Sequence, residues 1–412
     1  MTTCPKWRLG LCLLTSVLVL AAGELLMRRL RPQLTFSEAA RLSPTFWQPS
    51  RSVPAELKPG HHEDAFSAET QMAIPITINS QGFRNPEFAL SKPAGVFRIL
   101  ILGDSFAFNA AMPDAWVHAR LLERLLNHAT IRPAYRFEVI NCGYADGYSP
   151  ESYIAFMQAR GFALAPDLVI LQYFVRNDFV EPLETTVTEW KDGLPAAVQS
   201  TTRRVDARGT LRSRYTQFKY RLPILRESHL FLGLYQVGRG VLSRLLPRSR
   251  GHRFEPGAFR VEYVEYMDVY RDPLPPTLME SLRRSIELIV RFETLSRRRG
   301  APVVVFLIPT GLQVDSDAWT TVFGNRLPFP EPAGQAVPQR LLVHAFSAAG
   351  LTVWNPLEQY RRTAQHQRLY LGRDHDGHWT AAGNEVTAYL LFEGVRQLLG
   401  RESSLTTRAW SR

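Results

Sequence analysis

Cysteine is scarce in this sequence. The 412 residues include three cysteines, with Cys4 and Cys12 near the N-terminus and Cys142 standing alone. Three isolated cysteines form neither a disulfide framework nor a CxxC-type metal site. A chain of this length can bury a large core without disulfides, so an exporting compartment stays compatible with the count. No cluster of histidine, cysteine and carboxylate side chains has the spacing of metal ligands, and we expect no metal or cofactor.

Acidic residues are outnumbered by basic ones. There are 38 Asp and Glu against 49 Lys and Arg, which gives a net charge of +11 and a sequence pI of about 9.8. A basic surface favours anionic neighbours such as lipid head groups or an acidic polymer. The sequence has no zinc-finger spacing, basic zipper or RNA-binding signature, so nucleic acid is not an expected partner.

Long apolar runs are also few, and the clearest lies at the N-terminus. Residues 9–23 are mostly apolar, with Lys6 and Arg8 before them and Arg28 and Arg29 after them. The run is near the lower limit of roughly 17–25 residues for a spanning helix. We expect residues 1–31 to be an uncleaved membrane anchor, with the rest of the chain periplasmic or extracellular. A signal peptide cleaved near Ala21 and a buried N-terminal helix are the alternatives, and basic residues on both flanks leave the orientation open.

After this segment the chain divides into an arm, a regular region and a tail. Residues 32–95 are proline-rich and suggest an irregular arm, residues 401–412 suggest a frayed polar tail, and residues 96–400 alternate strand and helix patterns. The predicted strands are Arg98–Leu102, Phe137–Asn141, Leu168–Phe174, Pro302–Ile308 and Leu351–Trp354. The predicted helices are Ala115–Ala129, Glu151–Ala163, Pro276–Arg299, Pro338–Ala348 and Ala381–Leu399. This alternation predicts an α/β fold: a three-layer, doubly wound parallel sheet of five strands in the order 2-1-3-4-5.

One segment interrupts the alternation. Residues 181–275 are rich in arginine and include an apolar helical piece at residues 228–235. We interpret it as an insertion on the site side of the sheet. Its basic, amphipathic character fits either a membrane surface or a solvated lid.

Polar residues follow the predicted strands where each strand ends. Ser105 follows the first strand, Gly147 the second and Asn177 the third, while Asp376 and His378 precede the last helix. Since the carboxyl ends of parallel strands meet at one edge of a sheet, we expect these residues to converge there. The alternative is a structural role for each of them: a helix cap for Ser105 and Asp376, a strand-end cap for Asn177, a turn for the glycine and a place in the first turn of the last helix for His378.

Acyl transfer requires such a set of groups. A serine hydroxyl is a weak nucleophile that needs a base within hydrogen-bond reach, and an imidazole held by a carboxylate is the usual base. Backbone N–H groups and an asparagine amide can bind the developing oxyanion. The chain has no Gly-x-Ser-x-Gly elbow, which argues against the standard α/β-hydrolase arrangement.

The four blocks Gly103-Asp104-Ser105, Gly147, Asn177-Asp178 and Asp376-Gly377-His378 resemble those of the SGNH (GDSL-type) esterases and lipases, over roughly residues 77–400. The resemblance implies a flavodoxin-like strand order and a catalytic triad of Ser105, His378 and Asp376. It also implies an oxyanion hole formed by the N–H groups of Ser105 and Gly147 and the side chain of Asn177.

The sequence departs from the family pattern in three places. The usual acid, three residues before the histidine, is replaced by His375, so Asp376 takes the role and Asp374 is the fallback. Val175 and Arg176 stand where a glycine normally precedes the asparagine. The loop after the second strand is longer than usual, so the N–H of Gly143 is an alternative to that of Gly147 in the oxyanion hole.

The expected function is hydrolysis of an acyl or acetyl ester carried by a lipid or glycan. An O-acetyltransferase acting on an exported polysaccharide is the main alternative. Polysaccharide O-acetyltransferases related to the SGNH family have the same Asp-x-His spacing. A non-catalytic scaffold with the same fold is the third hypothesis. The oligomeric state and the acyl chain do not follow from the residues.

Overall fold

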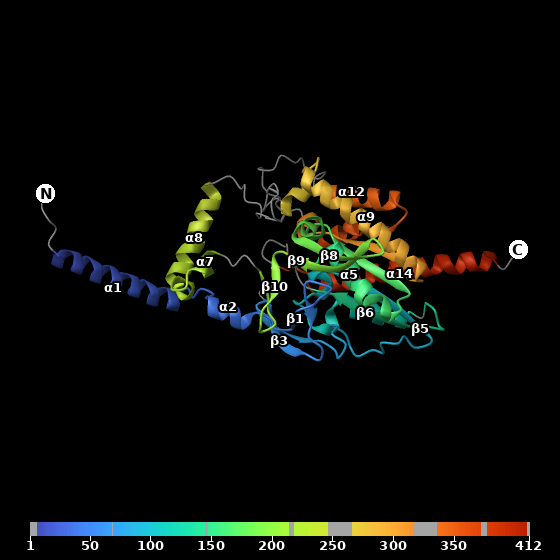
Figure 1. Cartoon of the computed structure of the whole chain (residues 1–412), viewed down its shortest axis with the longest axis horizontal. Coiled ribbons are helices and arrows are strands. Elements are labelled where there is room, and N and C mark those ends of the chain that lie inside the picture. Colours follow the sequence, from blue (N-terminus) through green and yellow to red (C-terminus); the bar gives the residue numbers. More distant parts are fainter. Residues whose placement is uncertain are drawn as a thin grey trace. The chain divides into compact units, whose positions relative to one another are not determined.

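The computed structural model describes residues 6–67, 69–129, 131–144, 147–213, 218–245, 266–315, 336–371 and 377–409. The chain forms two units, Met1–Ser43 with Ser213–Arg250 and Pro44–Arg212 with Gly251–Arg412 (Figure 1). This division cuts across the segments suggested by the sequence. Most of the arm belongs to the unit that carries the sheet, and the middle of the insertion belongs with the N-terminal helix.

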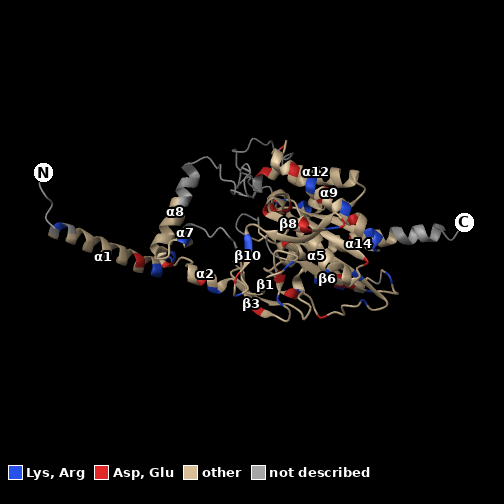
Figure 2. Ribbon diagram, in the orientation of Figure 1, with Lys and Arg blue, Asp and Glu red and all other residues tan. Residues whose placement is uncertain are grey.

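The first unit is helical. Its elements are α1 (Lys6–Leu30), α2 (Phe36–Leu42), α7 (Phe218–Arg221), the 3₁₀ turn η4 (Leu225–Glu227) and α8 (His229–Leu245). The stretch Gly10–Leu30 of α1 is long and apolar enough to cross a membrane and is not buried, and Figure 2 shows charge only toward the ends of α1. A signal sequence has the same length and composition. The helix is therefore compatible with either an anchor or a signal.

Glu24 joins α1 to α8. Its carboxylate accepts hydrogen bonds from the Ser228 hydroxyl (2.8 Å) and from the backbone N–H groups of His229 (3.0 Å) and Leu230 (2.9 Å). These N–H groups belong to the start of α8 and have no partner within the helix. A single carboxylate in an apolar segment thus caps the neighbouring helix.

The second unit is organised around a parallel sheet. Its strands are β5 (Val96–Gly103), β6 (Arg136–Gly143), β7 (Leu168–Phe174), β12 (Val303–Ile308) and β13 (Thr352–Trp354). They lie in the order β13-β12-β7-β5-β6, and all neighbours are parallel. Numbered along the chain, this order is 2-1-3-4-5, so the predicted fold class and strand order are confirmed.

Helices cover both faces of this sheet. The long ones are α4 (His118–His128), α5 (Pro150–Ala159), α9 (Pro276–Arg298), α12 (Val337–Ala348), α13 (Leu357–Ala364) and α14 (Ala381–Ala409). Alternate residues of β5 point to two separate cores: Leu100 packs with α5, α9 and α12, and Ile101 packs with α4, α13 and α14. Strands buried on both faces need long apolar runs, and β5 has one at residues 99–102. The last helix continues through residues 401–409, where we expected a frayed tail.

Short turns of helix join these elements. They are α3 (Ser105–Phe108), η1 (Asp114–Trp116), η2 (Gly161–Leu164), α6 (Asn177–Val180), η3 (Glu181–Glu184), η5 (Tyr266–Tyr270) and α10 (Gly311–Val314). Two of them, α3 and α6, begin with residues of the predicted site. Each directly follows the carboxyl end of a central strand.

The arm is more regular than its composition suggested. It contains the paired strands β1 (Trp47–Gln48) and β2 (Glu56–Leu57) and the hairpin β3 (His62–Ser67)–β4 (Met72–Thr77). Two further hairpins come from the insertion: β8 (Thr185–Lys191) with β9 (Leu194–Ser200), and β10 (Arg203–Val205) with β11 (Leu211–Ser213). Ile74 and Ile76 of β4 are buried in the main core, so this hairpin of the arm is part of the sheet unit.

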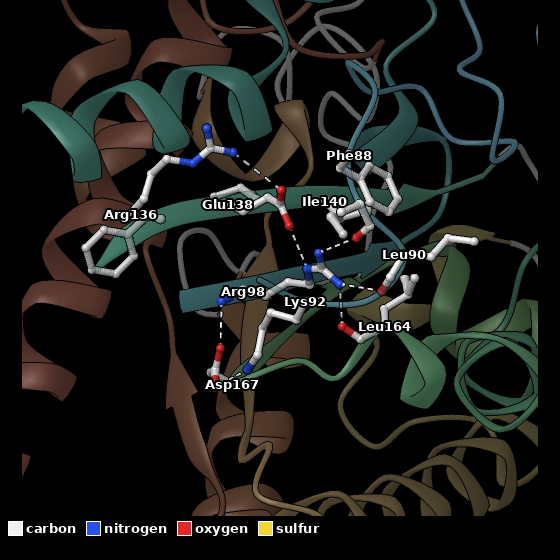
Figure 3. A network of polar contacts seen from close by, with 12 residues as sticks. Phe88, Leu90, Lys92, Arg98, Arg136, Glu138, Ile140, Leu164 and Asp167 are labelled. Atoms are coloured by element: carbon white, nitrogen blue, oxygen red, sulfur yellow. Dashed lines mark hydrogen bonds and ion pairs between the residues drawn. The ribbon is translucent and has the colours of Figure 1, made fainter. Parts of the chain in front are cut away.

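The amino ends of the central strands are held by Arg98 (Figure 3). Its fully buried guanidinium donates to Glu138 (Nε to Oε2, 2.6 Å) and to the backbone carbonyls of Ala89 (2.6 Å), Leu90 (3.1 Å) and Leu164 (2.6 Å). A buried charge needs this degree of pairing. The network ties β5 to β6 and to the loop before β7, at the edge opposite the predicted site.

Candidate active site

Ser105 stands at the start of α3, directly after β5. A tight approach of α3 to the strand ends requires glycine: a Cβ on Gly103 would lie 2.8 Å from the Cβ of Ala107, and one on Gly143 would lie 2.5 Å from it. The Asp104 side chain accepts the N–H of Phe106 (2.9 Å) and so caps this short helix. The strand-to-helix turn leaves Ser105 partly exposed at the carboxyl end of the sheet.

His378 approaches from the turn that precedes α14. Its carbonyl accepts the N–H of Leu371 (2.7 Å), and the Leu371 carbonyl accepts the N–H of Gly377 (3.0 Å). A Cβ on Gly377 would lie 2.8 Å from the backbone of Leu371, so only glycine fits there. The imidazole packs on Phe106, with ring centroids 5.0 Å apart, and its Nε2 lies 2.9 Å from the Ser105 Oγ. The structure therefore brings the predicted nucleophile and base together.

A carboxylate occupies the other side of the His378 ring, and it comes from the arm. The Oε1 of Glu69 lies 2.7 Å from Nδ1 of His378, and Oε2 accepts the backbone N–H of the same histidine at 3.1 Å. Burial acts to raise the pKa of Glu69, but the hydrogen bonds and charge of His378 outweigh it and the pKa is lowered. Sequence reasoning missed this residue, since no motif marks it.

No protein-family model and no curated protein matches this sequence. Among solved structures, LAE5, an alpha/beta hydrolase enzyme from the metagenome of Lake Arreo in Spain, is 14% identical with a TM-score of 0.36, covering 72% of this chain and 94% of its own. An acetylxylan esterase from Geobacillus stearothermophilus is 11% identical (TM-score 0.35; 72% and 93% covered). A lipase/acylhydrolase from Enterococcus faecalis is 12% identical (TM-score 0.35; 73% and 96% covered). Because values this low carry no argument about function, the activity proposed below rests on this chain's own residues.

Asn177 begins α6 at the end of β7, next to the nucleophile turn. Its Nδ2 lies 3.3 Å from Oδ2 of Asp104. An amide nitrogen carries two hydrogens, so the contact with Asp104 fixes the side chain and uses one donor. The following residue, Asp178, is fully buried and accepts the Tyr153 hydroxyl (2.9 Å) and the Phe174 N–H (2.7 Å). Burial, with the nearby charge of Asp104, raises the pKa of Asp178.

The N–H groups of Gly147 and Gly143, the two candidates for the oxyanion hole, both donate to side chains of the protein. Gly147 has φ +93°, a left-handed value that favours glycine, and its N–H donates to Oε1 of Glu181 at 3.0 Å. The rival, Gly143, donates its N–H to the Asn141 side chain at 2.8 Å. In this structure both N–H groups are thus directed at side chains of the protein.

Asp376, the predicted triad acid, lies outside the described residues, as do Asp374 and His375. Within the part of the chain that the structure describes, no group of three or more His, Cys, Asp or Glu residues could hold a metal ion. Cys142 is buried, and burial raises the pKa of its thiol. The described residues that meet at this edge bring together a hydroxyl, an imidazole and a carboxylate.

Proposed function

We propose that this protein is a serine esterase of the SGNH type, attached to a membrane by its N-terminal helix. The observation that carries the proposal is the 2.9 Å contact between Nε2 of His378 and Oγ of Ser105. A hydroxyl at this distance from an imidazole can transfer its proton as it attacks a carbonyl. The order of the strands and the placement of Ser105 after the first of them support the assignment.

The reaction has two halves. Ser105 Oγ attacks the ester carbonyl while His378 takes the hydroxyl proton, and the same proton passes to the leaving alkoxide as the carbon–oxygen ester bond breaks. Water then attacks the acyl-serine while His378 accepts its proton, and returning that proton to Oγ releases the carboxylic acid and restores the serine. No group beyond water and the ester is needed for this balance.

The donors that stabilise the oxyanion are the side-chain amide of Asn177 and the backbone N–H of Ser105. The Asn177 amide is fixed by Asp104, so a hydrogen not donated to that carboxylate is available to a substrate oxygen. Gly147 joins this set when the Glu181 carboxylate releases its N–H. The Asn177 amide and the Ser105 N–H need no such rearrangement, and preorganised donors of this kind cost no reorganisation at the moment of reaction.

The proposed substrates are ester-bearing lipids or acetylated glycans. The basic character of the chain favours substrates at an anionic surface, and the α1 anchor would hold the enzyme there. We propose that the catalytic unit lies outside the cytoplasm. The described residues contain no feature that favours transfer to a sugar over transfer to water.

The test is turnover of a short-chain nitrophenyl ester by the full-length chain in detergent. Ser105→Ala should abolish the activity, while Ser80→Ala, at an exposed serine of the arm, should leave it unchanged. Equal turnover by wild type and Ser105→Ala would exclude Ser105 as the nucleophile.

A further inference from the structure

Glu69 and His378 are 309 residues apart in the sequence and meet at the candidate site. Glu69 lies in the turn of the β3–β4 hairpin, within the arm. Its two carboxylate oxygens hold two N–H groups of one residue: Nδ1 of the ring and the backbone nitrogen. This double contact fixes both the ring orientation and the position of the His378 backbone.

The contact also sets the tautomer of His378. An ionised carboxylate can only accept, so Nδ1 must carry the hydrogen that is shared with Glu69. In the neutral imidazole the other nitrogen, Nε2, is then the acceptor, and it is the nitrogen that faces Ser105. This is the tautomer that a general base requires.

The hairpin that carries Glu69 is anchored in the sheet unit. Its turn is closed by the N–H of Gln71 on the carbonyl of Ser67 (2.8 Å), and β4 is buried through Ile74 and Ile76. The N–H of Thr77, at the end of β4, donates to Asp114 at 3.2 Å. Asp114 belongs to the segment that follows the nucleophile helix, so the carboxylate and the serine are supported by connected parts of the chain.

We propose that Glu69, rather than Asp376, is the carboxylate that orients His378 and balances its charge during catalysis. The inference rests on the proposed esterase function and deepens it. The N-terminal arm then supplies a positioning residue of the site, from the turn between β3 and β4.

The experiment compares Glu69→Gln with Asp376→Asn in the full-length chain in detergent, with Asp64→Asn as the matched control. Asp64 is an exposed carboxylate of the same hairpin. Loss of the acid of a triad lowers kcat by about 10⁴-fold in the reference case. We expect kcat of Glu69→Gln to be at least tenfold lower than kcat of Asp376→Asn. The kcat of Asp64→Asn should equal that of wild type. A larger loss in Asp376→Asn than in Glu69→Gln overturns the assignment.

A second readout separates positioning from a purely structural role. Removing the carboxylate charge disfavours the imidazolium, so Glu69→Gln should move the acid limb of the kcat/KM profile to lower pH. Glu69→Asp keeps the charge and should keep the limb near its wild-type position, with partial activity. An acid limb that stays in place in a folded Glu69→Gln variant overturns the assignment.

The failure of the proposed function has a different signature. The ring of His378 can be followed by NMR in folded protein without any turnover. If wild type is inactive but Glu69→Gln lowers the pH at which the imidazole titrates, the pairing stands and the esterase function fails. If wild type is active and the titration is the same in both proteins, the function stands and the role of Glu69 fails.

Discussion

Arg84 donates to the backbone carbonyl of Asn109, the residue that ends the helix begun by Ser105. The distance from Nη1 to this oxygen is 2.6 Å, and the same guanidinium reaches the carbonyls of Phe108 (2.7 Å) and Met112 (2.5 Å). Asn109 is left-handed, with φ +46°, and its N–H closes on the carbonyl of Ser105. A buried arginine of the arm therefore holds the segment that follows the nucleophile.

Replacing this arginine should cost both stability and activity. Arg84→Met leaves several buried carbonyls without a donor and removes the partner of Asp114, a loss of about 3 kcal/mol in unfolding free energy. We expect a lower urea midpoint and reduced turnover. Arg51→Met, at an exposed arginine of the arm, is the control and should match wild type. Unchanged turnover in Arg84→Met would show that the hydrogen bonds of Arg84 to the carbonyls after α3 do not position Ser105.

The amide of Asn177 should act in the transition state. Asn177→Ala removes an oxyanion donor, and we expect kcat to fall by about 10²–10³-fold with little change in KM. Asn177→Asp should be as damaging, because a carboxylate cannot donate and would face Asp104. Steady-state kinetics with a nitrophenyl ester measure both constants. A rise in KM at constant kcat would instead assign the side chain to ground-state binding.

His118 should make the stability of the sheet unit depend on pH. The ring is fully buried, its Nε2 lies 2.9 Å from Nε2 of Gln172, and burial lowers its pKa from 6.5 to about 4. The unfolded chain therefore binds more protons than the folded one between these values, and stability rises with pH across that range. The contribution is fully present above pH 6.5 and is lost as the pH falls toward 4, by about 3 kcal/mol at most.

Urea unfolding at several pH values between 4.5 and 7 measures this effect. His118→Asn removes the titrating ring, so the pH dependence should be shallower in the variant than in wild type. Parallel curves for the two proteins would mean that His118 titrates equally in the folded and unfolded chains.

The Arg98 network should stabilise the fold without contributing to catalysis. Arg98→Met removes the closer partner of the buried Glu138 carboxylate and leaves only the exposed Arg136, at 3.6 Å, to pair with it. The carbonyls of Ala89, Leu90 and Leu164 lose a donor as well, so we expect a cost of about 3 kcal/mol. Adding Glu138→Gln should restore part of the stability, because the buried side chain that lost its closer partner is then uncharged. We expect kcat per folded molecule to stay near wild type, because the network lies at the opposite ends of the strands. A large fall in kcat would contradict this separation.

The sheet could be predicted because its signal is local. Runs such as Leu168–Phe174 are mostly apolar, as strands buried on both faces are, and their alternation with helices predicts a parallel arrangement. Ser105 and His378 could be predicted because their blocks follow such strands or open the last helix. In each case the neighbouring residues carry the information.

Glu69 and Arg84 could not be assigned from the sequence, for a physical reason. Each acts through contacts with residues far along the chain, and neither Glu nor Arg has a local pattern that reveals its partner. The role of Arg84 follows only from its three-dimensional contacts with residues 108–114. The proline content of residues 32–95 predicts an irregular arm, yet short strands form there, and one of them, β4, includes Pro75.

The central claim is that Ser105 is a nucleophile activated by His378, and covalent labelling tests it most directly. The full-length chain in detergent is treated with a fluorophosphonate, digested, and mapped by mass spectrometry beside Ser105→Ala and His378→Ala. We expect one adduct on the peptide that contains Ser105, none in Ser105→Ala, and strongly slowed labelling in His378→Ala. A folded wild-type protein that takes up no label, or an adduct on another residue that persists in Ser105→Ala, would contradict the account.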